Sequence, residues 1–244
     1  MSEWWEGIKA DFVLNFINED RWTLLVTGLG NTLKITFVAL IIGILLGSIV
    51  ATARSTYDKN GADMAKRNKG GYVVLSIFNI ICKLYLTVIR GTPMVVQLLI
   101  MYFIIFASSN NGLMVAMIAF GINSGAYVAE IIRGGIMSID NGQFEAGRSL
   151  GFNYGQTMIY IIIPQVFKAV LPTLCNEFIV LLKETSVAGY IGIRDLTKGG
   201  DIIRAATYSP FMPLITVALI YLVMVVILSA LLGKLERRLR RDER

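Results

Sequence analysis

Three long stretches of this sequence, residues 35–53, 91–129 and 205–233, contain no charged side chain. A helix that crosses the hydrocarbon core of a bilayer requires about 20 mostly apolar residues. One buried helix of a soluble protein could explain a single stretch of this kind, but three exceed what one core can hide. Charged residues make up 16% of the chain, against about 25% in soluble domains. These features predict an all-α integral membrane protein.

Turn signals divide the apolar stretches into five predicted membrane spans. The stretch 91–129 is too long for one helix, and the run Ser-Ser-Asn-Asn-Gly at residues 108–112 marks a turn within it. The segment Gly71–Ile89 is apolar but is interrupted by Lys83 and followed by Arg90. Because short basic segments stay cytoplasmic, we expect it to lie along the inner membrane surface. The predicted spans are Leu24–Ala53, Pro93–Ala107, Leu113–Arg133, Leu171–Ile191 and Phe211–Leu232.

The distribution of charge predicts the orientation. Short loops rich in Lys and Arg stay on the cytoplasmic side, and this rule places the loop after the first span, the 138–172 region and the C-terminus inside. The N-terminal residues 1–23 interleave acidic residues with Trp4, Trp5 and Trp22, which is typical of an interfacial segment. We therefore expect an extracytoplasmic segment 1–23, one transmembrane domain 24–235 and a basic cytoplasmic tail 236–244. The net charge of +6 then reflects loops that face anionic lipid, and a nucleic-acid partner is not expected.

Residue usage excludes several kinds of chemistry. The chain has no histidine, and its two cysteines, Cys82 and Cys175, both lie in apolar surroundings without metal-ligand spacing. The phosphate-binding pattern G-x-x-x-x-G-K-[ST] is absent from the sequence. We therefore expect no metal site, no bound cofactor and no enzymatic activity on this chain.

The segment 138–172 predicts two short helices on the inner side. Asp140 with Gln143, and Asn153 with Gln156, have the three-residue spacing of capping boxes. Between them a helix is expected over Asn141–Leu150, ended by Gly151 in the left-handed conformation. A short helix that projects from a membrane domain is suited to docking a soluble partner.

The same segment carries a family resemblance. Glu145-Ala146-Gly147, followed after three residues by Gly151 and after nine more by the run Ile161 to Pro164, resembles the EAA loop of permease subunits of ATP-binding-cassette (ABC) importers. Gly147 and Ile163 depart from that pattern, in which Ala and Leu stand at these positions. The resemblance implies that Glu145, Ala146, Gly147 and Gly151 couple the chain to an ATPase subunit through a cytoplasmic coupling helix.

Further segments resemble the polar amino acid permeases, also called the histidine–glutamine permease family. The matching segments are Arg90 to Pro93 with Val96 to Leu98, Asn123 to Tyr127 with Ala129-Glu130 and Arg133-Gly134, Gly142-Gln143, Pro164-Gln165, Leu171-Pro172, Asn176-Glu177 and Lys183 to Ser186. The resemblance implies a multi-pass permease of the bacterial plasma (inner) membrane that imports polar amino acids. It also implies a partner ATPase that binds ATP and Mg²⁺, an extracytoplasmic solute-binding protein, and a second permease copy, either identical or similar.

Polar side chains within the spans are candidates for the substrate pathway, because charge inside a bilayer is costly. An amino acid carries a carboxylate and an ammonium group, so its path requires donors and acceptors. The candidates are Asn123, Ser124, Tyr127, Glu130, Glu177, Lys183, Glu184, Thr185 and Ser186. Two structural alternatives stay open: Glu130 pairs with Arg133 near the inner surface, and Lys183 and Glu184 form a gate at the outer end.

Five spans are too few to enclose a pathway, so a dimer is expected. Gly43 with Gly47, and Gly121 with Gly125, form two G-x-x-x-G patterns that allow helices to approach closely. Neither pattern identifies the dimer interface. The alternative function is an ion-coupled secondary transporter or channel subunit, although no internal repeat of the kind common in such folds is visible.

Overall fold

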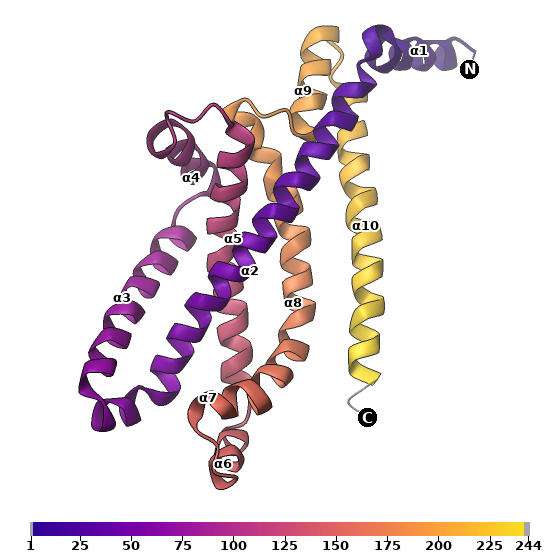
Figure 1. Ribbon diagram of the computed structural model, residues 1–244. Helices are drawn as coiled ribbons and strands as arrows, with labels where there is room; N and C mark the ends of the chain where they lie inside the picture. The colour runs from indigo at the N-terminus through magenta and orange to yellow at the C-terminus, as the bar shows by residue number, and fades with distance from the viewer. Residues whose placement is uncertain (1, 242–244) are drawn as a thin grey trace. The chain divides into compact units, whose positions relative to one another are not determined.

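The computed structural model describes residues 2–241, and every regular element in this range is a helix (Figure 1). Shorter π or 3-10 segments occur at Val13–Ile17, Asn18–Asp20, Met101–Ile105, Met158–Ile162 and Thr185–Ile191. Of the predicted terminal segments, Met1 and residues 242–244 lie outside the described residues. The α-helices are α1 (Ser2–Phe12), α2 (Trp22–Arg67), α3 (Lys69–Gly91), α4 (Met94–Ile100), α5 (Gly112–Ser138), α6 (Asn141–Ser149), α7 (Tyr154–Thr157), α8 (Ile163–Glu184), α9 (Leu196–Thr207) and α10 (Phe211–Arg241).

Five helical stretches of the described chain are long and apolar enough to cross a membrane, which confirms the predicted class and number. One of the five differs from the prediction. The helix α3 has 23 residues and a mean hydropathy of 2.0 over its most apolar window, whereas the predicted span Pro93–Ala107 is only the short helix Met94–Ile105. The five stretches are Trp22–Arg67, Lys69–Gly91, Gly112–Ser138, Tyr154–Ile191 and Phe211–Arg237.

The assignment of Gly71–Ile89 to the membrane surface was therefore wrong. The error arose because the charges of Lys83 and Arg90 were counted against a membrane span. Lys83 is exposed on α3 and is not buried against another helix of the chain. Arg90, near the C-terminal end of α3, is paired with Glu130 of α5 at 3.8 Å. An exposed lysine and a paired arginine do not prevent an apolar helix from crossing.

One predicted loop is helical in the structure, and one predicted span is longer than expected. The basic stretch after the first predicted span continues α2 as far as Arg67, and only Asn68 separates it from α3. The Asn68 side chain accepts a hydrogen bond from the backbone N–H of Gly71 at 3.0 Å and so caps α3. In the fourth span, the helix is continuous over Tyr154–Ile191 rather than beginning at Leu171. A π turn at Met158–Ile162 ends two residues before Pro164, and π turns and prolines both occur where a helix bends.

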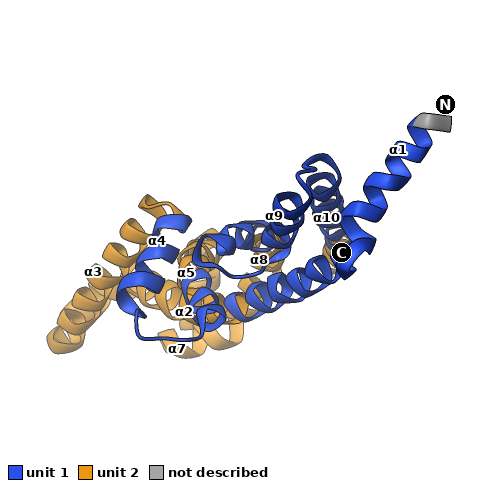
Figure 2. Cartoon of the chain, turned by 90° about the horizontal axis from the view of Figure 1, so that it is seen from above, with its two compact units in different colours: residues 1–39, 94–120, 179–231 blue, residues 40–93, 121–178, 232–244 orange. Residues whose placement is uncertain are grey.

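The chain divides into two compact units, coloured separately in Figure 2. Unit 1 comprises residues 1–39, 94–120 and 179–231. Its core contains Phe16, Leu25, Leu196, Ile203 and Val217. Unit 2 comprises residues 40–93, 121–178 and 232–244. It contains one apolar cluster around Phe144 and Ile162 and another around Val50 and Leu86.

In unit 2 the two G-x-x-x-G patterns meet each other. A Cβ atom at Gly47 would lie 2.6 Å from Cγ1 of Val128, and one at Gly43 would lie 3.0 Å from Oγ of Ser124. A Cβ atom at Gly121 would lie 2.7 Å from Cβ of Ile42, so the close approach is made from both sides. The glycines therefore serve the packing of α2 against α5 within one chain.

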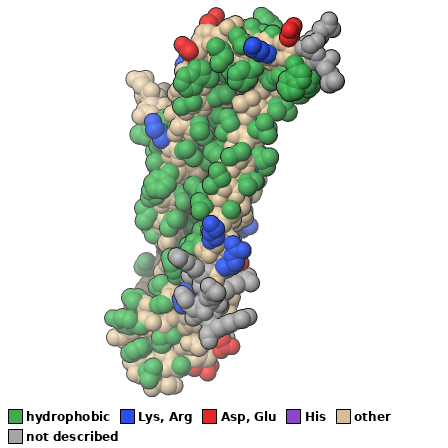
Figure 3. Space-filling view, turned by 90° about the vertical axis from the view of Figure 1, so that its right-hand side faces the viewer, with side chains coloured by type: hydrophobic (Ala, Val, Ile, Leu, Met, Phe, Trp, Pro, Cys, Tyr) green, Lys and Arg blue, Asp and Glu red, His purple; other side chains and the backbone are tan. Residues whose placement is uncertain are grey.

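Much of the apolar surface is uncovered. Figure 3 shows a face dominated by hydrophobic side chains, with charged side chains gathered toward its ends. Only 6% of the most apolar window of α10 and 17% of that of α3 is buried. Phe211 is 70% exposed and Ile104 72% exposed. Surfaces of this kind require lipid or the helices of another chain.

Candidate functional site

Two side chains fix the short helix α6: Asp140 caps its start, and Phe144 packs its buried face. The carboxylate of Asp140 accepts a hydrogen bond from the N–H of Gly142 at 2.6 Å and caps the helix. The predicted partnership with Gln143 is wrong, because the Gln143 side chain accepts instead from Nε2 of Gln165 at 3.2 Å. On its inner face, α6 buries Phe144 in the cluster that contains Ile162.

The corner between α6 and α7 agrees with the sequence analysis. Gly151 has a φ of +82°, the left-handed conformation that ends α6. The backbone N–H of Phe152 bonds to the carbonyl of Gly147 at 3.0 Å. Asn153 and Gln156 form the predicted capping box, with both reciprocal bonds at 2.9 Å. These bonds fix the direction in which α6 leaves the chain.

The four residues predicted to contact an ATPase differ in exposure. Glu145, Ala146 and Gly151 are exposed, whereas Gly147 is buried. A Cβ atom at Gly147 would lie 2.6 Å from Cγ2 of Thr157. The structure therefore gives Gly147 a packing role at the corner and leaves Glu145 and Ala146 on the surface of the helix.

Polar contacts tie α6 to the C-terminal half of α2. The ammonium group of Lys59 donates to Oδ1 of Asn141 at 2.6 Å and lies 5.0 Å from the ring centroid of Phe144. Arg148 pairs with Asp63 at 3.4 Å, and both side chains are about half exposed. Exposed pairs of this kind contribute little stability, but two separate contacts fix the position of α6 along α2.

A cluster of five charged side chains, which we call the arginine cluster, joins α2, α3 and α5 in unit 2. Arg54 donates to Glu130 at 2.9 Å, and Arg90 and Arg133 approach the same carboxylate at 3.8 Å. Arg133 also pairs with Asp58 at 3.4 Å. The pair between Glu130 and Arg133, one of the two structural alternatives, is present in the structure. Arg54 and Asp58 were not predicted, although their i,i+4 spacing on one helix face was an available signal.

The other candidates on α5 are divided between interior and surface. Asn123 and Ser124 are buried, and the hydroxyl of Ser124 donates to the carboxylate of Glu177 at 3.1 Å. Tyr127 is 37% exposed, and its ring lies 5.8 Å from the guanidinium of Arg90. Glu177, a candidate because it is a carboxylate within a predicted span, is therefore in contact with a second candidate, Ser124.

The remaining candidates lie in unit 1, at the end of α8 and in the 3-10 segment Thr185–Ile191. Lys183 is exposed, Glu184 and Ser186 are partly buried, and Thr185 is buried with its hydroxyl donating to the carbonyl of Leu182 at 2.7 Å. The structure brings Ser186 into a pocket of unit 1, whereas the candidates on α5 belong to unit 2.

The helix α9, which the sequence analysis did not predict, supplies further charged groups in unit 1. The Asp195 carboxylate caps the helix by accepting from the N–H groups of Thr197 at 3.0 Å and Lys198 at 3.3 Å. Burial raises the pKa of Asp195 although these hydrogen bonds oppose the shift. Hydrogen bonds from Arg204 and from Lys198 lower the pKa of Asp201. No group of three or more potential metal ligands (His, Cys, Asp or Glu) occurs among the described residues.

Comparison with known proteins identifies the family. Residues 43–241 match the family described as binding-protein-dependent transport system inner membrane component. This chain belongs to that family of permeases. The permease is 38% identical to the arginine transport system permease protein ArtQ of Bacillus subtilis (strain 168), with 88% of this chain and 92% of ArtQ covered. It is 34% identical to the glutamine transport system permease protein GlnP of Escherichia coli (strain K12), over 89% and 93% of the two chains.

Solved structures support the same family. The permease superposes on a chain of an amino acid ABC transporter crystallised with histidines, with a TM-score of 0.77, 42% identity and coverage of 91% and 98%. A chain of the MetNI methionine ABC transporter, in an inward-facing conformation, has the same fold with a TM-score of 0.70 at 19% identity, over 89% of the permease and 97% of that chain. As the inner membrane component of a binding-protein-dependent ABC system, the permease spans the membrane several times, and ATP hydrolysis belongs to a partner subunit.

Proposed function

We propose that this permease forms half of the membrane pathway of an ATP-driven importer of polar amino acids. The relatives named for arginine and glutamine transport, and the homologous transporter crystallised with histidines, support this substrate class. ATP and Mg²⁺ bind to the partner ATPase, and a solute-binding protein delivers the amino acid. Coupling to the ATPase is assigned to α6.

The coupling assignment to α6 rests on one observation. Glu145 is exposed on this helix, and the helix itself is held in place by contacts with the rest of the chain. Glu145 and Ala146 face solvent, while Phe144 is buried beneath them and Lys59 and Asp63 hold α6 against α2. A helix held in this way transmits the movement of a bound partner as a rigid body. Gly147 and Gly151 contribute by shaping the corner.

The dimer and the orientation belong to the same proposal. Helices that bury as little as α10 and α3 leave large apolar faces for a second permease, identical or similar, and for lipid. We place the N-terminal segment 1–23 outside, with Trp4 and Trp5 at the membrane interface, and α6 and the tail 236–244 in the cytoplasm. Trp4 and Trp5 are each more than 60% exposed, as an interfacial anchor requires.

For the substrate pathway we propose roles according to exposure. Tyr127 and Lys183 offer exposed surface, and the partly buried Glu184 and Ser186 follow on the same helical end. Thr185 is buried, so it shapes the wall of the pathway. Asn123 and Ser124 are buried, so they shape the wall of the pathway, with Ser124 held by Glu177. Glu130 is already engaged by three arginines, which favours the structural alternative for this residue.

The test reverses the charge at the coupling helix. We expect Glu145→Lys to stop ATP-dependent amino acid uptake by proteoliposomes that contain the permease, its ATPase and the binding protein, and to reduce recovery of the ATPase with the purified permease. Ala62→Lys is the matched control, because Ala62 is exposed on α2 and lies outside α6. We expect Ala62→Lys to leave uptake unchanged.

Two results would contradict the proposal. Unchanged uptake and ATPase recovery in Glu145→Lys would remove α6 from the coupling contact. A wild-type complex that hydrolyses ATP but moves none of the polar amino acids would overturn the substrate class.

A further inference from the structure

Unit 2 contains a pocket of about 420 Å³ where the last turns of α2 meet the corner between α6 and α7, and we call it the corner pocket. Arg148 and Asn153 line it from the corner. Its lining residues on α2 recur at i, i+3, i+4 and i+7 and therefore share one helix face: Asn60, Asp63, Met64 and Arg67. Sites for small molecules have volumes of about 300–1,000 Å³, so the corner pocket is large enough for one.

The charges of the corner pocket favour an anionic ligand. Two arginines and one aspartate line it, which gives a formal charge of +1. Asp63 pairs with Arg148 at 3.4 Å, whereas no carboxylate among the described residues forms an ion pair with Arg67. The neighbouring charges along the two helices are Lys66, which adjoins Arg67, and Glu145, three residues before Arg148. They have opposite signs, so the sum stays at +1.

The corner pocket also offers more hydrogen-bond donors than acceptors. A guanidinium group has five N–H donors and no acceptor, and the contact of Arg148 with Asp63 uses only its Nη2 atom. That contact is long and half exposed, so Arg148 can turn toward a ligand at little cost. The side-chain oxygen of Asn153 already accepts from the N–H of Gln156 at 2.9 Å, which leaves its amide nitrogen as a donor. A negatively charged ligand with several acceptor oxygens is complementary to this arrangement.

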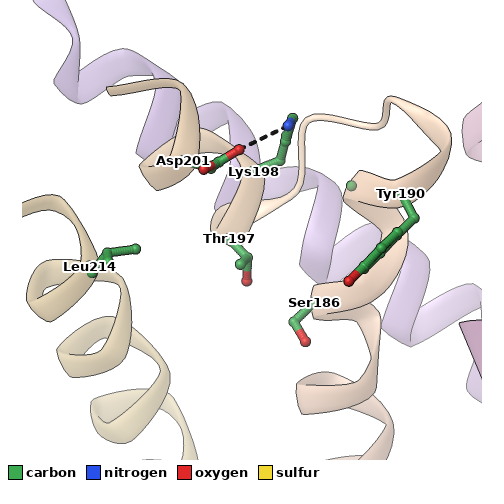
Figure 4. A pocket seen from close by; sticks show the side chains of 7 residues that line it. Ser186, Tyr190, Thr197, Lys198, Asp201 and Leu214 are labelled. Atoms are coloured by element: carbon green, nitrogen blue, oxygen red, sulfur yellow. Dashed lines mark hydrogen bonds and ion pairs between the residues drawn. The ribbon is translucent and has the colours of Figure 1, made fainter. Parts of the chain in front are cut away.

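The pocket of unit 1 beside α9 has no such excess of positive charge. It is lined by Lys198 and Asp201, which are joined at 2.9 Å (Figure 4). Arg204 also donates to Asp201, and the carboxylate of Asp195 accepts from the backbone N–H of Lys198 at 3.3 Å. Two cations and two carboxylates sum to zero there, so charge does not favour an anion in that pocket.

We propose that the corner pocket binds a phosphate group between Arg67 and Arg148. The planar guanidinium group of arginine matches phosphate oxygens with two parallel hydrogen bonds. Basic pockets on the cytoplasmic side of membrane helices bind lipid head groups, so an anionic phospholipid and a soluble phosphate are the two sources of this chemistry. The cytoplasmic position of the pocket rests on the proposed function. Because the two arginines belong to α2 and α6, a bound phosphate holds these helices together more firmly than the Asp63 pair alone.

The test measures the binding of two phosphate probes to the delipidated permease–ATPase complex in detergent. Dioleoyl phosphatidylglycerol is titrated against dioleoyl phosphatidylcholine, and native mass spectrometry gives the Kd of the first lipid bound. Radiolabelled inorganic phosphate is titrated by equilibrium dialysis, where phosphate bound by the ATPase itself is common to all variants. We expect Arg67→Gln/Arg148→Gln to raise the Kd of the bound probe about tenfold or more, because hydrogen bonds to charged groups are among the stronger ones. The Kd of phosphatidylcholine should not change.

Lys66→Gln/Lys69→Gln is the matched control. It removes two positive charges from the same end of α2 and the start of α3, at exposed positions that do not line the pocket. We expect its Kd for the bound probe to stay within about twofold of the wild-type value. Arg67→Lys/Arg148→Lys keeps the charge but loses the paired geometry, so it should restore only part of the affinity. All four positions are exposed, and the unfolding midpoint of each variant checks that it is folded.

The two probes separate the two sources. Tight binding of phosphatidylglycerol with weak binding of inorganic phosphate would identify the lipid, and the reverse would identify a soluble phosphate.

The proposal fails if the wild-type complex binds neither probe. It also fails if the arginine and lysine variants raise the Kd equally, since general attraction to a basic surface would then explain the binding. If the arginine variant loses its ATPase but binds both probes like the wild type, the pocket receives the partner subunit, and our assignment is wrong. Both titrations measure binding, so a complex that hydrolyses ATP without amino acid uptake refutes only the proposed function.

Discussion

Replacing Gly147 by alanine is a sensitive test of the corner between α6 and α7. Alanine is the residue that the EAA pattern has at this position, and it favours a helix interior over glycine by about 1 kcal/mol. In this structure, however, the added Cβ atom would lie 2.6 Å from Cγ2 and 2.7 Å from Oγ1 of Thr157. The favourable separation of two carbon atoms is about 3.5–4.0 Å, so α6 must move away from α7 by about 1 Å.

Overpacking of this kind costs about 1–3 kcal/mol. The gain in helix propensity offsets about 1 kcal/mol of that cost, so Gly147→Ala should destabilise the corner by up to about 2 kcal/mol. Gly155→Ala is the matched control, since the nearest atom to its new Cβ would be Oδ1 of Asn153 at an ordinary 3.5 Å. The two alanine variants should differ in stability by about 1–3 kcal/mol.

Thermal unfolding of the purified permease and its affinity for the ATPase are the two measurements. Each 1 kcal/mol corresponds to a change of about 2–4 °C in the midpoint for a chain of this size. Thr157→Ala removes both atoms that clash, although it also removes the hydrogen bond from Thr157 to the carbonyl of Asn153. The double variant should therefore recover much of the loss caused by Gly147→Ala. Equal stabilities of the two glycine variants, or no rescue in the double variant, would refute the packing argument.

Three further predictions concern unit 2. Gly47→Ala should destabilise the packing of α2 against α5 by about 1–3 kcal/mol in thermal unfolding, because backbone and side-chain atoms of α5 lie within 3 Å of the new Cβ. Its control is Gly30→Ala on the same helix, which has open space around it and should be neutral or slightly stabilising. Arg54→Met should lower the unfolding midpoint through loss of the 2.9 Å bond to Glu130, and Arg54→Lys should restore part of the loss. Gly151→Ala should cost about 1 kcal/mol, measured in the same assay, because its φ of +82° is unfavourable for any residue with a Cβ atom.

Features set by neighbouring residues could be predicted from the sequence. Long uncharged stretches predict the number of membrane-crossing helices, and the capping box of Asn153 and the left-handed Gly151 follow from spacings of a few residues. The capping box of Asp140 was wrong for a reason that local spacing does not contain. Its expected partner Gln143 is bound by Gln165, 22 positions later in the chain.

Features set by distant contacts could not be predicted. The charge of Arg90 favoured a surface position for Gly71–Ile89 over a membrane span. Its partner Glu130 lies 40 positions away in the sequence and becomes its neighbour only after folding. The helix α9 was missed because Gly199 and Gly200 weaken its propensity. The structure explains both glycines: a Cβ atom would lie 2.7 Å from the carbonyl oxygen of Leu24 at Gly199, and 2.4 Å from a methyl group of Val217 at Gly200.

The contacts of unit 2 form a continuous path from α6 into the membrane-crossing helices. Lys59 and Asp63 hold α6 to α2, and fewer than ten positions earlier on the same helix Arg54 binds Glu130 of α5. Beyond the arginine cluster, Gly47 brings the two helices into backbone contact. Under the proposed function, a partner that displaced α6 would move α2 and α5 together, because close-packed helices shift as a unit instead of deforming. The proposed coupling would then require no flexible hinge between α6 and these helices.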